Sequence, residues 1–189
     1  MKIYLLDRKP EQVKFWKLYF ADVRGVSTVC ADFADFMESH PDIDCVVSPA
    51  NSHGLMDGGY DAAITDYFGT ELIPAVQAYI REHYACEQPV GTSFIISIPG
   101  TSKRLIHTPT MRVPSIIREP LVVYQCMRTT LLCARENDVK SILIPAFGGS
   151  CGRVPPLKLA LLMRAAYDQL ANPPSAMDWE YASRGLERI

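Results

Sequence analysis

Three polar side chains able to bind or transform a ligand surround a glycine pair in the first half of the chain. The stretch CVVSPANSHGLMDGGYDAAI carries Asn51, Asp57 and Asp61 around Gly58 and Gly59. An amide can hydrogen-bond hydroxyl groups, and a carboxylate can act as a general base toward water. Consecutive glycines allow positive φ angles and leave no Cβ between the backbone and a ligand. These residue types, placed directly after an apolar segment, indicate a binding site that could also be catalytic.

A second glycine-rich break, GGSCGRVPP, follows the apolar run SILIPAF near residue 148. Backbone N–H groups in such loops, and at the start of the helix that follows, attract anions and especially phosphate. Two such loops facing one crevice would suit a diphosphate. Neither loop matches GxGxxG or GxxxxGK[ST], which argues against ordinary dinucleotide and Walker sites. The alternative is that each loop is only a tight turn between a strand and a helix.

Short apolar runs alternate along the chain with segments of helical periodicity. Strands are predicted over residues 2–6, 25–30, 43–48, 93–100, 104–111 and 141–147. Helices are predicted over residues 11–23, 31–40, 62–69, 71–84, 121–139 and 157–171. The segment GTSK predicts a hairpin between the fourth and fifth strands, which makes the sheet mixed. The alternation indicates an α/β fold, and in such sheets ligands bind beyond the carboxyl ends of the strands.

The length and composition are those of one ordinary globular domain. The chain has 189 residues, of which 48% are hydrophobic and 21% are charged, enough for a well-filled core without suggesting disorder. We expect a single domain over residues 1–171. Residues 172–189 are expected to form a tail or a short helix packed on that domain.

Charge and hydropathy exclude several classes of function. A formal net charge of -2 and a pI near 6.1 give no footprint for non-specific nucleic-acid binding. No apolar run approaches the roughly 18 to 20 residues of a membrane span, and the N-terminus becomes charged too early for a signal peptide. The expected location is therefore cytoplasmic.

The six cysteines are expected to be reduced, since four lie in apolar segments and none forms a CxxC pair. The four histidines are scattered, and no His, Cys or carboxylate cluster has the spacing of metal ligands. No cofactor is implied, and any catalysis is expected to be independent of metal.

The two glycine loops together resemble the signatures of macrodomains, the ADP-ribose-binding α/β/α modules. VVSPANSHGLMDGGYDAAI is similar to the first signature, in which a strand ends in an Ala-Asn pair, here Ala50 and Asn51, before a glycine-rich loop. ILIPAFGGSCGRVPP resembles the second diphosphate loop, and CADFADF more loosely resembles the early motif that reads adenine. The resemblance covers most of residues 1 to 171 and implies a three-layer α/β/α fold with a mixed central sheet. It also implies ADP-ribose, or an ADP-ribosylated protein or nucleic acid, as the partner.

For the adenine, the resemblance points to two neighbouring residues. Asp32 would accept a hydrogen bond from the adenine amino group, and Phe33 would offer its backbone N–H to a ring nitrogen. Asp32 is equally suited to be the N-cap of the helix predicted over residues 31–40. Both interpretations stay open.

For the ribose and the diphosphate, the resemblance points to the two glycine loops. Asn51 would hydrogen-bond the hydroxyls of the distal ribose, although a turn at the strand end is its other interpretation. Arg153 would lie near the distal ribose and a phosphate. Catalysis by Cys151 is not indicated, because no histidine partner is near in sequence. The residues implied to line the diphosphate are Gly58, Gly59, Tyr60, Phe147, Gly148, Gly149, Ser150, Cys151 and Gly152.

Asp61 follows Asn51 by ten residues, which is the spacing between the ribose-binding Asn and the catalytic Asp of hydrolytic macrodomains. The resemblance implies that Asp61 orients the distal ribose and acts as general base for water attacking the anomeric carbon. The other interpretation is a carboxylate that only favours the first turn of a helix. Asp57 and His53 stand where the family more often has glycine or small residues. Asp57 is either a second acidic group at the reacting end or a solvated loop charge.

The sequence therefore predicts a hydrolase that frees ADP-ribose from a modified acceptor or a related ester, with Asp61, Asp57 and Asn51 as its catalytic residues. The alternative is a reader module that binds ADP-ribose without turnover, because binding requires the loops and Asp32 but not Asp61.

Overall fold

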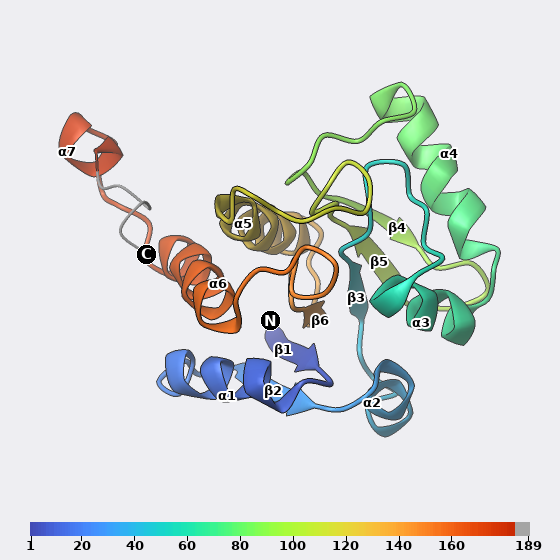
Figure 1. Cartoon of the computed structure of the whole chain (residues 1–189), viewed down its shortest axis with the longest axis horizontal. Coiled ribbons are helices and arrows are strands. Elements are labelled where there is room, and N and C mark those ends of the chain that lie inside the picture. The colour runs from blue at the N-terminus through green and yellow to red at the C-terminus, as the bar shows by residue number, and fades with distance from the viewer. Residues whose placement is uncertain (184–189) are drawn as a thin grey trace.

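The computed structural model describes residues 1–183 and contains a six-stranded sheet between two layers of helices (Figure 1). The strands are β1 (Lys2–Asp7), β2 (Val26–Cys30), β3 (Cys45–Ser48), β4 (Phe94–Ser97), β5 (Arg104–His107) and β6 (Ser141–Pro145). The helices are α1 (Pro10–Tyr19), α2 (Phe33–Ser39), α3 (Gly59–Phe68), α4 (Leu72–Tyr84), α5 (Leu121–Glu136), α6 (Pro156–Ala171) and α7 (Trp179–Ala182). Each predicted strand and helix is present, with ends that differ from the predicted ones by up to four residues. The predicted α/β/α fold with a mixed central sheet is confirmed.

The strand order is β2-β1-β6-β3-β5-β4, and only the β4–β5 pair is antiparallel, as the hairpin predicted. All the strands except β4 run parallel to one another. Their carboxyl ends therefore meet at one edge of the sheet, where the loops that follow them lie together.

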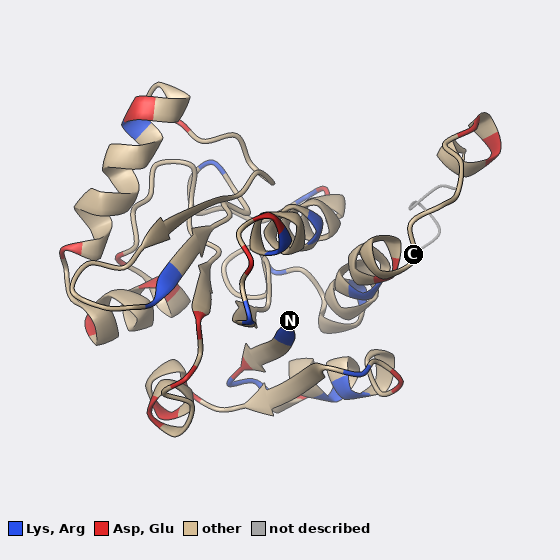
Figure 2. Ribbon diagram, turned by 180° about the vertical axis from the view of Figure 1, so that it is seen from behind, with Lys and Arg blue, Asp and Glu red and all other residues tan. Residues whose placement is uncertain are grey.

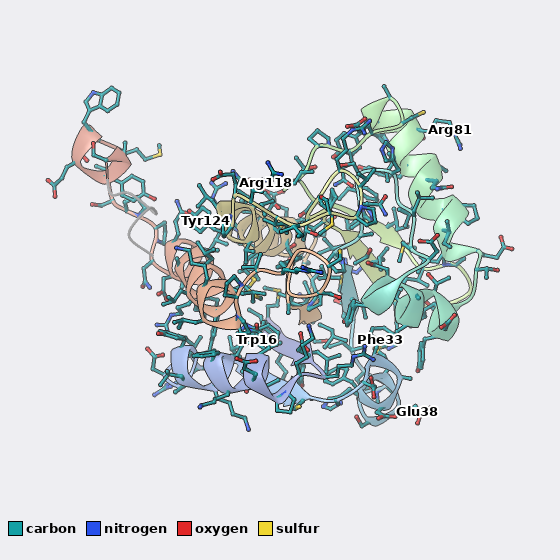
Figure 3. The ribbon with its side chains drawn as sticks, viewed as in Figure 1. Trp16, Phe33, Glu38, Arg81, Arg118 and Tyr124 are labelled. Carbon is teal, nitrogen blue, oxygen red and sulfur yellow. The ribbon has the colours of Figure 1, made fainter. Side chains whose placement is uncertain are left out.

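Helices cover both faces of the sheet, so the central strands are buried on both sides. Successive side chains of a strand point to opposite faces and therefore join different cores. On β3, Cys45 and Val47 join a core cluster with α1, α5 and α6, while Val46 joins a second cluster with residues of α2, α3 and α4. Figure 3 shows Trp16 between α1 and α6 and Phe33 between α2 and α3. The two helical layers thus fix the sheet edge from both sides.

Residues 172–183, which follow α6, are mostly exposed. Trp179 in α7 is 87% exposed, and the hydroxyl of Tyr181 accepts a hydrogen bond from Nε2 of Gln169 at 2.8 Å. Figure 1 places α7 beyond the end of α6, away from the loops that follow the strands. The remainder of the expected tail, residues 184–189, lies outside the described residues.

The surface charges are mixed in sign: Figure 2 shows Lys and Arg interspersed with Asp and Glu over the helices and loops. No helix within residues 1–183 is both long enough and apolar enough to cross a membrane. All six cysteines are free thiols, and three are buried, one fewer than the apolar segments suggested.

His107, at the end of β5, makes the stability of the fold sensitive to acid. The side chain is fully buried, its Nδ1 donates to Oε1 of Gln88 at 2.6 Å, and burial lowers its pKa to about 3. The unfolded chain therefore binds a proton between roughly pH 6.5 and 3 that the folded protein does not bind. We expect the free energy of unfolding to fall as pH decreases through this range, by up to about 1.4 kcal/mol per pH unit.

Denaturant titrations between pH 7 and 4 test this expectation. His107→Asn keeps a donor for Gln88 but cannot titrate, so its stability should fall less steeply with acid than that of the wild type. Equal slopes for the two proteins would show that His107 does not contribute.

Candidate active site

Five loops at the carboxyl edge of the parallel strands surround a cavity of about 370 Å³. The loops follow β1, β2, β3, β5 and β6, so every parallel strand contributes lining residues. In the sheet order β2 and β5 are separated by four strand spacings, about 19 Å. A cavity lined from strand ends so far apart suits an elongated ligand whose parts bind in a fixed order.

The loop after β3 is held in shape by the side chain of Asn51. Its Nδ2 donates to the carbonyl of Leu55 at 2.8 Å, and its Oδ1 accepts from the backbone N–H groups of His53 and Leu55 at 3.1 and 3.3 Å. Asn51 therefore shapes the turn at the end of β3. Its buried side chain also lines the cavity, and Nδ2 keeps a second N–H that can donate to a ligand. His53 lies outside the lining, with Nδ1 3.1 Å from the carbonyl oxygen of Cys86.

Asp61 projects from the first turn of α3 into this cavity. Ser48, fully buried at the end of β3, donates its hydroxyl to Oδ1 of Asp61 at 2.6 Å. Burial raises the pKa of the Asp61 carboxyl to about 7, although the hydrogen bond from Ser48 lowers it. A carboxyl group that titrates near 7 can accept and return a proton at neutral pH, which is the property of a general base.

The hydroxyl of Tyr60 is buried beside this carboxyl. It has no hydrogen-bond partner within residues 1–183, although Tyr60 lines the cavity. Burial, and then the nearby carboxylates of Asp61 and Asp7, raise the pKa of Tyr60 well above its ordinary value. The phenol is therefore neutral and has a proton to donate to a ligand atom. The edge-on ring of Phe33, 5.5 Å away between centroids, fixes the orientation of the Tyr60 ring.

The two carboxylates whose roles the sequence left open both line the cavity. Asp32 stands at the N-cap of α2 with extended backbone angles, but its carboxylate makes no capping hydrogen bond. Asp57 is exposed on the loop after β3. Neither belongs to a group of three or more His, Cys, Asp or Glu side chains that could hold a metal, and no such group is found within residues 1–183.

The loop after β6 is held by backbone hydrogen bonds, both within the loop and from the segment before α5. The carbonyl of Gly148 accepts from the N–H of Val154 at 3.1 Å, and the carbonyl of Gly152 accepts from Ile117 at 2.9 Å. Gly148 has a φ of 73°, and a Cβ on Gly152 would lie 2.6 Å from the oxygen of Gly148. Both positions therefore require glycine for steric reasons.

The structure brings most, but not all, of the predicted site residues to the cavity. Phe147 is fully buried in the core, and Arg153 is exposed with a φ of 54°; neither is among the lining residues. Gly149 is also absent from the lining, and its backbone N–H donates to the carbonyl of Ala146 at 3.0 Å. The predicted residues that line the cavity are Asp32, Phe33, Ala50, Asn51, Asp57, Gly58, Gly59, Tyr60, Asp61, Gly148, Ser150, Cys151 and Gly152.

Sequence reasoning missed two groups of lining residues. Asp7 ends β1 and is followed by Arg8 and Lys9, and Thr110 and Met111 follow β5. Three consecutive charged residues at the end of a predicted strand could have indicated the first group, because both glycine loops also follow strand ends. The residues after β5 carry no comparable signal.

Ser48→Ala should raise the pKa of Asp61 further, since the hydroxyl hydrogen bond favours the ionised carboxylate. Loss of one hydrogen bond to a charged group corresponds to a shift of about one pKa unit. Carbon-detected NMR titration of the Asp61 carboxyl in both proteins measures this shift. An unchanged midpoint would show that Ser48 does not control Asp61.

The sequence and the fold are similar to those of known proteins. The model of the macro domain family matches residues 47–163. The chain is 33% identical over 118 residues to an uncharacterized protein of Aquifex aeolicus, covering 60% of this chain and 66% of that one. It is 33% identical over 108 residues to the O-acetyl-ADP-ribose deacetylase of Escherichia fergusonii, covering 55% and 59%. Both relatives are thus matched over less than two thirds of their own length.

Among solved structures, the Oceanobacillus iheyensis macrodomain with ADP superposes with a TM-score of 0.58 at 26% sequence identity. The superposition covers 67% of this chain and 68% of that one.

Proposed function

The chain belongs to the macro domain family, and from this we propose that it binds ADP-ribose and hydrolyses it from a modified acceptor. The acceptor is a mono-ADP-ribosylated protein, or a related ADP-ribose ester or nucleic-acid adduct. Two relatives support the ligand class, since one is named an O-acetyl-ADP-ribose deacetylase and another was solved with ADP. We propose that residues 1–171 form the functional unit.

The ligand would lie along the sheet edge in the order of the strands. The adenine binds at the end of β2, with Asp32 accepting from the amino group and the backbone N–H of Phe33 donating to the ring. The diphosphate lies between the loop at Gly58 and the loop at Gly148. The distal ribose then reaches the end of β3, where Asn51 and Asp61 both line the cavity.

The hydrolytic proposal is carried by one observation, the half-buried Asp61 carboxyl with a pKa of about 7 in the cavity. Ser48 occupies Oδ1, so Oδ2 is the oxygen that would face a water molecule. The ionised carboxylate accepts a proton from that water as the water oxygen bonds to the anomeric carbon, or to the acyl carbon of an ester. In the attack on the anomeric carbon, the bond to the acceptor breaks and the acceptor leaves with a proton. In the attack on the acyl carbon, the bond between that carbon and the ribose oxygen breaks, and the ribose oxygen of ADP-ribose takes the proton. General-base assistance of this kind contributes about 10²- to 10⁴-fold in rate.

Calorimetry with free ADP-ribose, paired with a release assay on ADP-ribosylated acceptors, tests the proposal. We expect saturable binding and release of ADP-ribose from at least one linkage among glutamate, aspartate, serine, arginine and nucleic acid. Binding without release from any of them would leave the reader module as the function. No heat at millimolar ADP-ribose would overturn the proposal entirely.

A further inference from the structure

Negative charges outnumber positive charges in the lining of the cavity. Among the described lining residues, the carboxylates are Asp7, Asp32, Asp57 and Asp61, and the cations are Arg8 and Lys9. A diphosphate would add negative charge to a partly enclosed space, where like charges repel more strongly than in water. Backbone N–H groups of the glycine loops carry only partial charges. A site of this composition needs its two cations close to the phosphates.

The sheet order places these cations where the phosphates are expected. β1 pairs with β2 on one side and with β6 on the other, so its carboxyl end lies between Asp32 and the loop at Gly148. The loop after β1 is fixed by Asp7, whose Oδ1 accepts from the backbone N–H of Lys9 at 2.7 Å. The cations therefore stand between the adenine end and the diphosphate loop.

The ammonium of Lys9 is already directed at that loop. Its Nζ donates to the carbonyl of Gly149 at 2.9 Å, across 140 residues of sequence. An ammonium group has three N–H donors, so it can keep this bond and also donate to a phosphate oxygen. Lys9 lies outside residues 47–163, which the family model matches.

We propose that Lys9 is a phosphate-binding residue that makes the cavity select phosphate-bearing adenine nucleotides over adenosine. The ammonium bridges the Gly149 carbonyl and the ligand diphosphate, which joins the β1 loop to the β6 loop over the bound ligand. The inference rests on the proposed function, because it assumes that the diphosphate lies along the Gly148 loop.

The test is calorimetry of ADP-ribose, ADP and adenosine with the wild type, Lys9→Met, Lys9→Arg and Lys14→Met. Lys14 is exposed on α1 and provides a matched loss of one surface charge. Loss of one hydrogen bond to a charged group predicts that Lys9→Met weakens ADP-ribose and ADP binding about tenfold. Adenosine affinity should not change, Lys9→Arg should recover most of the loss, and Lys14→Met should match the wild type.

Two results would overturn the inference. An equal loss for adenosine and ADP-ribose in Lys9→Met would mean that Lys9 only holds the loops together, and unchanged affinities would mean that it does not contact the ligand. In both cases ADP-ribose binding by the wild type would leave the proposed function standing. If instead the wild type binds no ADP-ribose, the proposed function itself fails.

Discussion

Asp61→Asn should lower the rate of ADP-ribose release at least about 100-fold while free ADP-ribose still binds. The amide has nearly the shape of the carboxyl group, and its oxygen can still accept the hydrogen bond that Ser48 now donates at 2.6 Å. What the variant loses is the ability to take a proton from water. Single-turnover release and calorimetry on the same preparation separate the two properties, and retention of more than about a tenth of the rate would contradict the assignment.

The same substitution should stabilise the fold at neutral and alkaline pH. Burial raises the pKa of Asp61 to about 7 in the folded protein, so the folded state binds a proton between about pH 4 and 7 that the unfolded chain has released. Stability from this group is therefore lost as pH rises through that window. Asn cannot ionise, so above pH 7 we expect the free energy of unfolding of Asp61→Asn to exceed that of the wild type by roughly 2 to 4 kcal/mol. Denaturant titration measures this difference. A less stable variant would indicate a structural role instead.

Asp57→Asn provides the matched comparison, because it removes the same charge from the same cavity. Asp57 is exposed on its loop, whereas Asp61 is half-buried and accepts a hydrogen bond from Ser48. A loss of release comparable with that of Asp61→Asn would show that the two carboxylates share the chemistry. A small loss would assign the chemistry to Asp61.

Gly152→Ala should weaken ADP-ribose binding at least about tenfold and destabilise the fold by about 1 to 3 kcal/mol. The added Cβ would lie 2.6 Å from the backbone oxygen of Gly148 and 3.0 Å from its Cα, and backbone atoms cannot move aside as a side chain can. The loop must therefore open, which displaces the N–H groups proposed to hold the diphosphate. Calorimetry and denaturant unfolding measure the two effects.

Gly100→Ala is the control for backbone strain. Gly100 lies in the turn between β4 and β5 with a φ of 71°, but a Cβ there would meet nothing within 4 Å. We expect a loss of stability of about 1 to 2 kcal/mol without a change in affinity. If Gly152→Ala binds ADP-ribose as tightly as this control does, the loop after β6 does not hold the ligand.

The local parts of the site could be predicted from the sequence, because they depend on short-range patterns. Apolar runs located β3 and β6, and the glycines after them marked loops that do line the cavity. Asn51 and Asp61 lie on one continuous strand-loop-helix segment, so their proximity follows from local geometry. The hairpin of β4 and β5 was predictable from its turn residues for the same reason.

The missed parts depend on long-range arrangement. Lys9 reaches the cavity because β1 inserts between β2 and β6, and no local pattern specifies that strand order. Ser48 lies on the same segment as Asp61, but within an apolar strand nothing in the sequence marks its hydroxyl as a partner of that carboxyl. Phe147 and Arg153 do not line the cavity, and the turn at Gly148 that separates them from the lining residues has no local signal beyond its glycines.

The pH dependence of single-turnover ADP-ribose release tests the central claim, that Asp61 is a general base with a pKa of about 7, most directly. The base acts in its ionised form, so the rate should rise with pH, with a midpoint near 7, and level off above it. In Asp61→Asn the residual rate should show no such midpoint. A wild-type rate that is independent of pH between 5 and 9, or a midpoint that persists in Asp61→Asn, would contradict the claim.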